Sequence, residues 1–281
     1  MNNSSVKHHY IPEFYQKGFY GDGGKLYAYT KKYGGIKERT AAQILYSPDL
    51  HTVMLGKEKT LAIEDFYSQL EGQFTTYRDL MRKNIGNADF IARLQADSNF
   101  IKIAKIMIAT QFWRTPCKRE LAIQHMPRLV ELYDKSNDEV KAIWSYDRKL
   151  IKFLSKRASK DEAVKVAQFI LLPLISFDMS DRSDNIKLFG TTGERTFFSS
   201  DRPVVYDSLE KLFAFSSFCF PFCKELLLLG TEKSIQRISV DDINALIAKK
   251  AAETVISASK EQLEAFKLTT GKLQSSRNNK P

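Results

Sequence analysis

One stretch of the sequence, residues 98–113, must lie inside whatever fold the chain adopts. It is apolar on nearly every side of a helix, and Lys102 and Lys105 are its main charged interruptions. A helix without a polar face is not stable on a protein surface, so we expect it to be packed inside the molecule. Thr115 and Pro116 end the helix, because the residue before a proline avoids helical backbone angles.

The last turn of this helix carries polar residues on a line that is otherwise apolar. Gln111 and Arg114 continue the face formed by Phe100, Ala104 and Met107. Stranding a buried charge without its partner costs about 3–5 kcal/mol, so a buried arginine must be paired. We therefore predict that Arg114 is largely buried and paired with one of three acidic residues, Glu64, Glu71 or Asp201.

A second helix is predicted from Lys59 to about Lys83, where apolar residues recur at spacings of three and four. Glu64, Glu71 and Arg78 recur every seven residues and so lie along one edge of that apolar face. Such an edge either keeps its charges in solvent or supplies partners for buried polar groups.

Strand-like patterns lie toward both ends of the chain. Residues 18–56 combine glycine-rich turn signals with short aromatic and β-branched runs. Residues 195–205, 213–222 and 225–229 have the apolar composition of buried strands. Helical periodicity separates these two regions over most of the chain.

The order of these patterns predicts an α+β fold, in which a largely helical middle packs on a small mixed sheet built from N-terminal and C-terminal strands. A helix over 241–256 and a continuation over 263–268 are expected near the end. We predict a single domain over residues 1–270. Residues 271–281 are rich in Ser, Asn and Lys and are predicted to be a disordered tail.

Composition limits the partners, the metal or disulfide sites and the cellular compartment that are expected for this chain. The formal net charge of +10 favours a polyanionic partner, although surplus lysine also serves solubility. Three cysteines without a CxxC pair argue against a disulfide framework or a zinc site. No secretory signal is visible, and the longest apolar stretches are too short to span a bilayer. A cytoplasmic protein without a membrane partner is expected.

The N-terminal segment contains the best candidates for chemistry. His8 and His9 are two of only four histidines, and they stand beside Tyr10, Phe14 and Tyr15. Histidine transfers protons near neutral pH more readily than any other side chain. The alternative is that the aromatic residues anchor the chain terminus and the histidines only form hydrogen bonds.

A basic stripe is the candidate nucleic-acid surface. Arg148, Lys152 and Lys156 are spaced four residues apart, which places them on one face of a helix. Cations in such a row can contact successive phosphates. The alternative is an ordinary solvated helix face.

Other chemistries lack their sequence signals. Neither a nucleotide-binding glycine loop nor a serine-hydrolase elbow occurs. His51 and His125 have no metal-ligand spacing with His8 or His9, so no metal residues are predicted by spacing. A magnesium site is the cofactor that stays open, built from the carboxylates Glu64, Glu71 and Asp201.

Several separate segments together resemble a bacterial family catalogued as domain of unknown function 4238. They span nearly the whole chain in a specific order, and the resemblance implies a family found among mobile genetic elements and phage-defence loci, without an established reaction. Arg202 departs from the family pattern, which often has asparagine there. In chain order the segments are His8 to Tyr15, Leu26 to Tyr29, Glu64 with Glu71, Gln111 with Arg114, Thr115 and Pro116, Ser200 and Asp201 with Pro203 to Val205, Phe220-Pro221 with Leu226 to Leu229, and Asn244.

If these distant polar residues converge, they form one pocket between the helices and the sheet. Either histidine would act as general acid or base, Asp201 would orient it, and Arg114 would bind a phosphate through its planar fork. The predicted catalytic residues are therefore His8, His9, Arg114 and Asp201. The predicted supporting residues are Tyr10, Glu64, Glu71, Gln111 and Ser200.

Two functions from different classes follow. The first is a defence effector, a hydrolase that cleaves RNA or DNA phosphodiesters. The second is a sensor or interaction protein without catalysis, which binds nucleic acid or a phage-derived trigger through its basic face. In the second case Glu71–Arg114 is only a buried ion pair, and Asp201 is a turn residue that bonds the nearby backbone.

Overall fold

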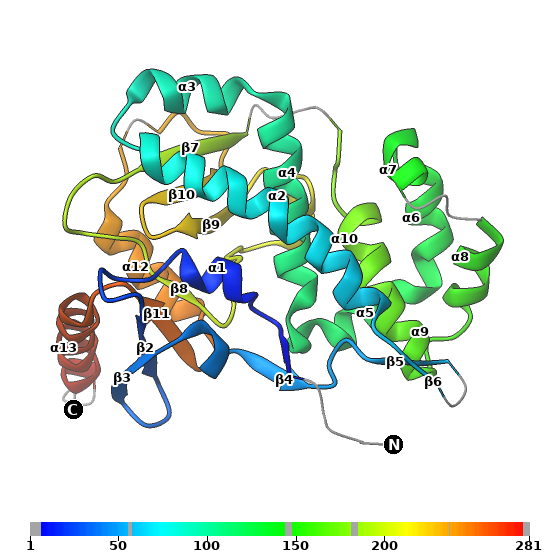
Figure 1. The fold of residues 1–281 in the computed structure, drawn as a ribbon, viewed down its shortest axis with the longest axis horizontal. Coiled ribbons are helices and arrows are strands. Elements are labelled where there is room, and N and C mark those ends of the chain that lie inside the picture. Colours follow the sequence, from blue (N-terminus) through cyan, green and yellow to red (C-terminus); the bar gives the residue numbers. More distant parts are fainter. Residues whose placement is uncertain (1–6, 56–57, 144–147, 181–184, 236, 278–281) are drawn as a thin grey trace.

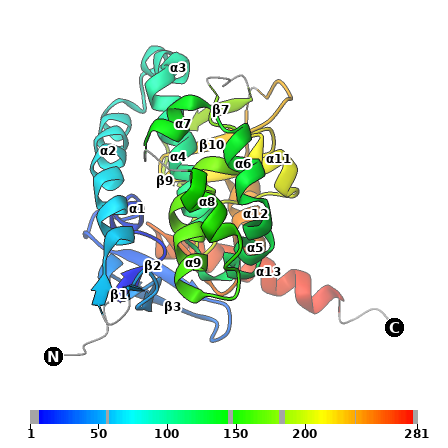
Figure 2. The same ribbon diagram turned by 90° about the vertical axis from the view of Figure 1, so that its right-hand side faces the viewer.

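The computed structural model describes residues 7–55, 58–143, 148–180, 185–235 and 237–277. Its central element is helix α4 (Ser98–Arg114), whose first turn is capped by the side chain of Asp97. Nearly every residue in its second half is buried, as the sequence predicts. Trp113 is fully buried, and its indole N–H donates to Ser176 Oγ at 2.9 Å. Figure 2 shows α4 between α2 on one side and α6 on the other.

Helix α2 (Ala62–Asn84) corresponds to the second predicted helix and packs on α4, where the ring centroids of Tyr77 and Phe100 lie 5.6 Å apart. The other helices cover the remaining faces (Figure 1). They are α1 (Glu13–Lys17), α3 (Ala88–Ala96), α5 (Arg119–His125), α6 (Leu129–Lys135), α7 (Asp138–Ile143), α8 (Arg148–Ser155), α9 (Asp161–Val166), α10 (Leu172–Ile175), α11 (Leu209–Phe213), α12 (Val240–Lys250) and α13 (Lys260–Arg277). Single turns are η1 (Ala41–Gln43), η2 (Pro116–Lys118), η3 (Met126–Arg128) and the π-helical η4 (Ala167–Leu171).

The strands form several small sheets. A four-stranded sheet has the order β3-β2-β11-β8 and therefore joins N-terminal to C-terminal strands, as predicted. A three-stranded sheet has the order β7-β10-β9, and β1 pairs with β4 and β5 with β6. Their bounds are β1 (Lys7–His9), β2 (Leu26–Thr30), β3 (Gly35–Arg39), β4 (Tyr46–Pro48), β5 (Val53–Leu55), β6 (Glu58–Thr60), β7 (Ile186–Gly190), β8 (Ser199–Ser200), β9 (Phe218–Cys223), β10 (Leu226–Gly230) and β11 (Thr254–Ser257).

These elements confirm the α+β class, with two differences from the predicted sheet. The strand pairs among the described residues are antiparallel, and they are divided between separate sheets. One core cluster nevertheless includes residues from Ile11 to Ile256.

The N-terminal segment is packed against the body, in agreement with its aromatic composition. Ile11 and Tyr15 are fully buried, and the ring of Phe14 stacks on that of Phe74 in α2. The Tyr15 hydroxyl donates to the carbonyl of Pro221 at 2.6 Å and lies 2.8 Å from Ser199 Oγ. This terminus is therefore held between α2 and the strands β8 and β9.

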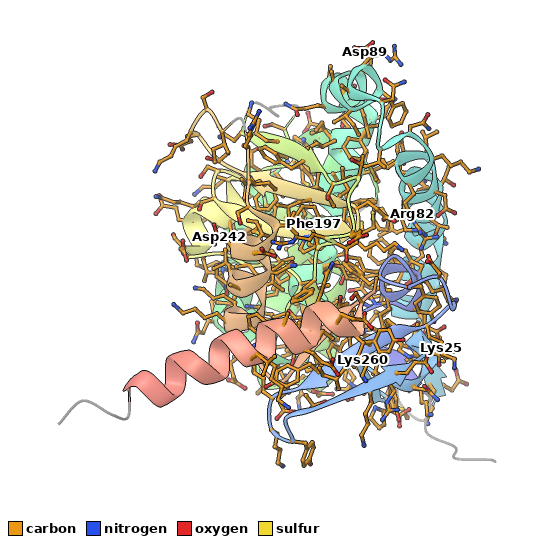
Figure 3. The ribbon with its side chains drawn as sticks, turned by 90° about the vertical axis from the view of Figure 1, so that its left-hand side faces the viewer. Lys25, Arg82, Asp89, Phe197, Asp242 and Lys260 are labelled. Atoms are coloured by element: carbon orange, nitrogen blue, oxygen red, sulfur yellow. The ribbon has the colours of Figure 1, made fainter. Side chains whose placement is uncertain are left out.

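Predictions near the C-terminus are corrected in two places. The helix expected over 241–256 ends at Lys250, and residues 254–257 form β11 in the centre of the four-stranded sheet. The strand expected over 213–222 begins only at Phe218, after helix α11. Helix α13 begins at Lys260 and projects past the body (Figure 3). It runs to Arg277, beyond the start of the predicted tail, and 278–281 lie outside the described residues.

Among the described residues, no helix is both long enough and apolar enough to cross a membrane.

Candidate functional site

Three segments bring two histidines and a glutamate together. His8 is the middle residue of β1, His51 lies just before β5, and Glu64 is in the first turn of α2. The two imidazole rings stack with their centroids 5.2 Å apart. The backbone N–H of His51 donates to His8 Nδ1 at 3.1 Å, and His51 Nδ1 is hydrogen-bonded to Glu64 Oε1. We call His8, His51 and Glu64 the histidine centre.

Aromatic packing buries His51, whereas Glu64 stays partly exposed. His51 is fully buried, with its ring against the edges of Tyr67 and Phe169. Burial lowers the pKa of His51 to about 3, although the hydrogen bond to Glu64 acts in the opposite direction. Burial also lowers the pKa of His8, against the charge of Glu64. Both rings are therefore neutral near pH 7.

The hydrogen-bond network assigns the tautomers of the two neutral rings. His8 Nδ1 accepts a hydrogen bond, so its proton lies on Nε2 and that atom is a donor. His51 Nδ1 donates to the carboxylate, so His51 Nε2 carries a free lone pair. Within the described parts of the chain, both Nε2 atoms are buried and have no hydrogen-bond partner. The centre therefore presents one proton donor and one proton acceptor.

The same three residues could hold a metal ion. One ligand atom from each of His8, His51 and Glu64 lies within 4.8 Å of the others. Two imidazoles and a carboxylate are a ligand set that suits zinc. Coordination through both Nε2 atoms would require His8 to move its proton and to give up the bond from the His51 N–H. The hydrogen-bonded arrangement described here therefore suits proton transfer better than metal binding.

Arg114 lies beside the centre and is buried, as predicted, with 4% of its side chain exposed. Its Nη1 donates to Glu71 Oε1 at 3.0 Å, and its Nη2 lies 4.0 Å from Glu64 Oε1. The guanidinium carbon is 4.1 Å from the centre of the Tyr67 ring. The Arg114 Nε is buried without a partner among the described residues. One donor of this arginine is therefore left for another group.

The pKa values of the two glutamates beside Arg114 are shifted in opposite directions. Burial raises the pKa of Glu71, and this effect outweighs the charge and hydrogen bond of Arg114. Burial also acts to raise the pKa of Glu64, but the hydrogen bond from His51 and the electrostatic effects of His51, Arg114 and His8 outweigh it, so that the pKa is lowered. Glu64 is therefore the ionised carboxylate that orients His51.

His9 lies at the more exposed side of this arrangement. Its side chain is 13% exposed, and Nδ1 is 3.6 Å from Glu13 Oε1 one helical turn later. Burial lowers the pKa of His9, against the charge of Glu13. Its Nε2 also lacks a partner among the described residues. Arg114 lies close enough to His9, as to His8 and His51, for its charge to act on the pKa of each imidazole in the lowering direction.

A model of the family described as "Protein of unknown function (DUF4238)" matches residues 7–261. The chain belongs to this family. The matched range includes the histidine centre, Arg114 and its glutamates, so the family resemblance predicted from the sequence is confirmed. Comparison with curated proteins and with solved structures gave no match.

Asp201 of this DUF4238 protein is engaged elsewhere. Its carboxylate accepts hydrogen bonds from the backbone N–H groups of Ala252, Glu253 and Thr254 at 2.7–3.0 Å. Ser200 Oγ accepts from the N–H of Arg202 at 3.1 Å. These bonds hold the turn that leads into β11. The partner expected for Arg114 or a histidine is therefore Glu71 or Glu64, and not Asp201.

The carboxylates considered for magnesium do not converge either. Glu64 and Glu71 are directed at Arg114, whereas both oxygens of Asp201 accept hydrogen bonds from backbone N–H groups.

Two of the predicted supporting residues, Tyr10 and Gln111, lie near the Asp201 turn. Burial raises the pKa of Tyr10 to about 12, and the charge of Asp201 acts in the same direction. Gln111 is buried and lines a cavity beside Arg202.

The predicted basic stripe of the DUF4238 protein is on the surface. Arg148 forms two hydrogen bonds with Asp134, at 2.8 and 2.7 Å, which reduces the charge it offers to a ligand. Lys152 and Lys156 are exposed. Their position is compatible with phosphate contacts and with a solvated face.

His51 is the site residue that the sequence did not indicate. It is separated from His8 by 43 residues, and from Glu64 by 13, so no ligand or dyad spacing reveals it. Only the pairing of β1 with β4 brings His8 next to the turn that carries His51.

Proposed function

We propose that this DUF4238 protein hydrolyses phosphodiester bonds in RNA or DNA at the histidine centre. One observation carries the proposal: His51 presents an unpaired Nε2 while Glu64 binds its Nδ1, beside an arginine that retains an unpaired N–H. A carboxylate–histidine pair is the arrangement used to accept a proton from a nucleophile. A guanidinium next to it is suited to the charge of a phosphate.

The proposed reaction uses one proton relay. His51 Nε2 takes a proton from a water molecule, whose oxygen forms a bond to phosphorus. The bond from phosphorus to the leaving oxygen breaks, and the proton returns from His51 to that oxygen. Glu64 stabilises the transient imidazolium. His8 Nε2–H and Arg114 Nε–H donate to the non-bridging oxygens as their negative charge grows.

The electrostatics of the site favour substrate binding before proton transfer. Burial, helped by the charge of Arg114, lowers the pKa of His51 to about 3 and makes it a weak base. A phosphate between the two would oppose the arginine charge and raise the pKa of His51 toward neutrality. The net charge of +10 supplies long-range attraction for a polyanion, and this attraction weakens with salt.

The direct test is cleavage of end-labelled single- and double-stranded RNA and DNA by the purified protein. We expect His51→Gln to lower the rate by a factor of about 10²–10⁴, the usual contribution of a general base. His9→Ala serves as a second variant near the surface. His125→Gln is the matched control, because His125 packs on Trp113 and bonds the Leu121 carbonyl, away from the centre.

Two results would contradict the proposal. One is cleavage by His51→Gln at the wild-type rate in a folded protein. The other is nucleic-acid binding by the wild type without cleavage of any substrate, which would favour the sensor function. Each reaction is repeated with a chelator and with added zinc or magnesium. Activity that depends on zinc would replace the proton relay by metal coordination at the same residues.

The proposed cellular role is phage defence. Cells that carry the wild-type gene should restrict phage infection, and cells with His51→Gln should not. The variant must accumulate to the wild-type level for this comparison to count.

A further inference from the structure

The cavity beside Arg202 lies at the C-terminal end of α4. It has a volume of about 260 Å³ and is bordered by the end of α4, by η2, by residues 202–207 and by Lys250 of α12. Two segments of the family pattern meet here, Gln111 with Thr115 and the Arg202-Pro203 turn. None of the residues of the histidine centre lines it.

The charges around this cavity are unbalanced. Lys118, Arg202 and Lys250 line it, and Asp207 is its acidic residue. Asp207 lies 3.3 Å from Lys250 and so neutralises that lysine in part. Among the described residues, neither Lys118 nor Arg202 has a carboxylate within salt-bridge distance. The cavity therefore has two cations in excess, which favours an anionic ligand.

Lys118 is held in place before any ligand arrives. Its Nζ donates to the Tyr206 hydroxyl at 2.8 Å and lies 4.2 Å from the centre of the Phe112 ring. An ammonium group has three donors, so two remain for a ligand. Because the lysine is already ordered, binding costs less side-chain entropy than at a mobile surface lysine.

One of the residues that line the cavity, Gln111, contains an unsatisfied buried acceptor. Gln111 is 2% exposed, and its Oε1 has no hydrogen-bond partner among the described residues. A buried amide oxygen without a donor has a free-energy cost, because it has lost its hydrogen bonds to water. A ligand with a hydroxyl or amino group would remove this cost. The aromatic rings of Phe112 and Tyr206, which meet edge to face with centroids 5.5 Å apart, add apolar surface.

We propose that this cavity binds a nucleoside monophosphate. Its phosphate would lie against Lys118 and Arg202, and a hydroxyl or amino group of the nucleoside would donate to Gln111. The volume lies just below the usual range for small-molecule sites, which limits the ligand to at most about one nucleotide. The same chemistry is offered by a free mononucleotide and by the 5′-phosphorylated end of a nucleic-acid strand.

The test is isothermal titration of the full chain at low salt. The probes are the four common nucleoside 5′-monophosphates, with adenosine as the ligand without phosphate. We expect saturable binding of at least one monophosphate, and weakening by about tenfold or more when the phosphate is absent or when Lys118→Gln is used. Arg202→Gln should also weaken the binding of the monophosphate. Lys249→Gln is the matched control, because Lys249 is an exposed neighbour on α12 that does not line the cavity.

The assay measures binding only, so its outcome is independent of any cleavage at the histidine centre. A 5′-phosphorylated trinucleotide and its unphosphorylated counterpart distinguish the two sources of the ligand. Equal affinity for the phosphorylated trinucleotide and the mononucleotide identifies a strand end, and binding of the mononucleotide alone identifies a free metabolite. Either result supports the site. The proposal is overturned if no monophosphate binds, if adenosine binds equally well, or if folded Lys118→Gln and Arg202→Gln bind like the wild type.

Discussion

Replacing Arg114 by alanine should destabilise the protein more than replacing any exposed arginine. The substitution removes the 3.0 Å bond to Glu71, the charge near Glu64 and the contact with the Tyr67 ring. Breaking a buried ion pair costs about 3–5 kcal/mol. The side chains of Glu64 and Glu71 are 29% and 31% exposed, so water can partly solvate them after the change. Loss of the ion pair should therefore cost about 3 kcal/mol, the lower end of that range.

The lost contact with Tyr67 adds about 1 kcal/mol, because cation–π interactions contribute this much when partly desolvated. The expected loss of unfolding free energy is therefore about 3–4 kcal/mol. For a chain of this size the melting temperature should fall by about 6–15 °C. Urea unfolding followed by circular dichroism and a thermal melt measure both quantities.

A matched surface pair sets the scale for this measurement. Arg119 donates to Asp161 at 2.8 Å, but its side chain is 44% exposed. Arg119→Ala should cost at most about 1 kcal/mol, as exposed pairs do. If Arg114→Ala costs no more than Arg119→Ala, Arg114 is not desolvated and the inference from its burial is refuted. A double-variant cycle with Glu71→Gln should give a coupling energy of about 1–3 kcal/mol.

Three further predictions concern other parts of the fold. Acid should destabilise the protein, because the pKa of His51 is lowered from 6.5 to about 3 and the unfolded chain then binds more protons between these values. Unfolding free energy should therefore fall as pH decreases below about 6.5, and a slope unchanged by His51→Gln would contradict this. Tyr15→Phe removes the hydroxyl that binds Pro221 and Ser199. It should lower the free energy of unfolding, measured in urea, by about 1–3 kcal/mol. An unchanged urea midpoint would show that the hydroxyl does not contribute to stability. Asp201→Ala should destabilise more than Asp201→Asn, because the amide oxygen can still accept from the backbone, and equal losses would show that these bonds do not stabilise the turn.

Local sequence patterns determined the helical middle of this protein. The all-round apolar composition of 98–113 can be satisfied only in the interior, and the structure buries that helix. The line from Phe100 to Arg114 also required a partner for the arginine, and Glu71 provides it. These predictions succeed because burial and charge pairing follow from helical periodicity alone.

The ends of helices and the short strands depended on distant contacts. The run after Lys250 continues a helical pattern in the sequence, yet residues 254–257 form a strand. This strand is stabilised by pairing with β2, more than 220 residues earlier, and by the bonds from its backbone to Asp201. Local propensity cannot include such partners, so tertiary pairing overrides it.

The sequence by itself identified His8, Arg114, Glu64 and Glu71 as candidate site residues. His8 stands in a dense polar and aromatic N-terminal segment, Arg114 continues an apolar line, and the two glutamates lie along the edge of an apolar helix face. Only the tertiary structure decided which of them meet. The β1–β4 pairing places His51 against His8, and the first turn of α2 supplies Glu64. A hydrogen bond depends on atoms a few ångströms apart in space, and distance along the chain carries almost no information about such contacts.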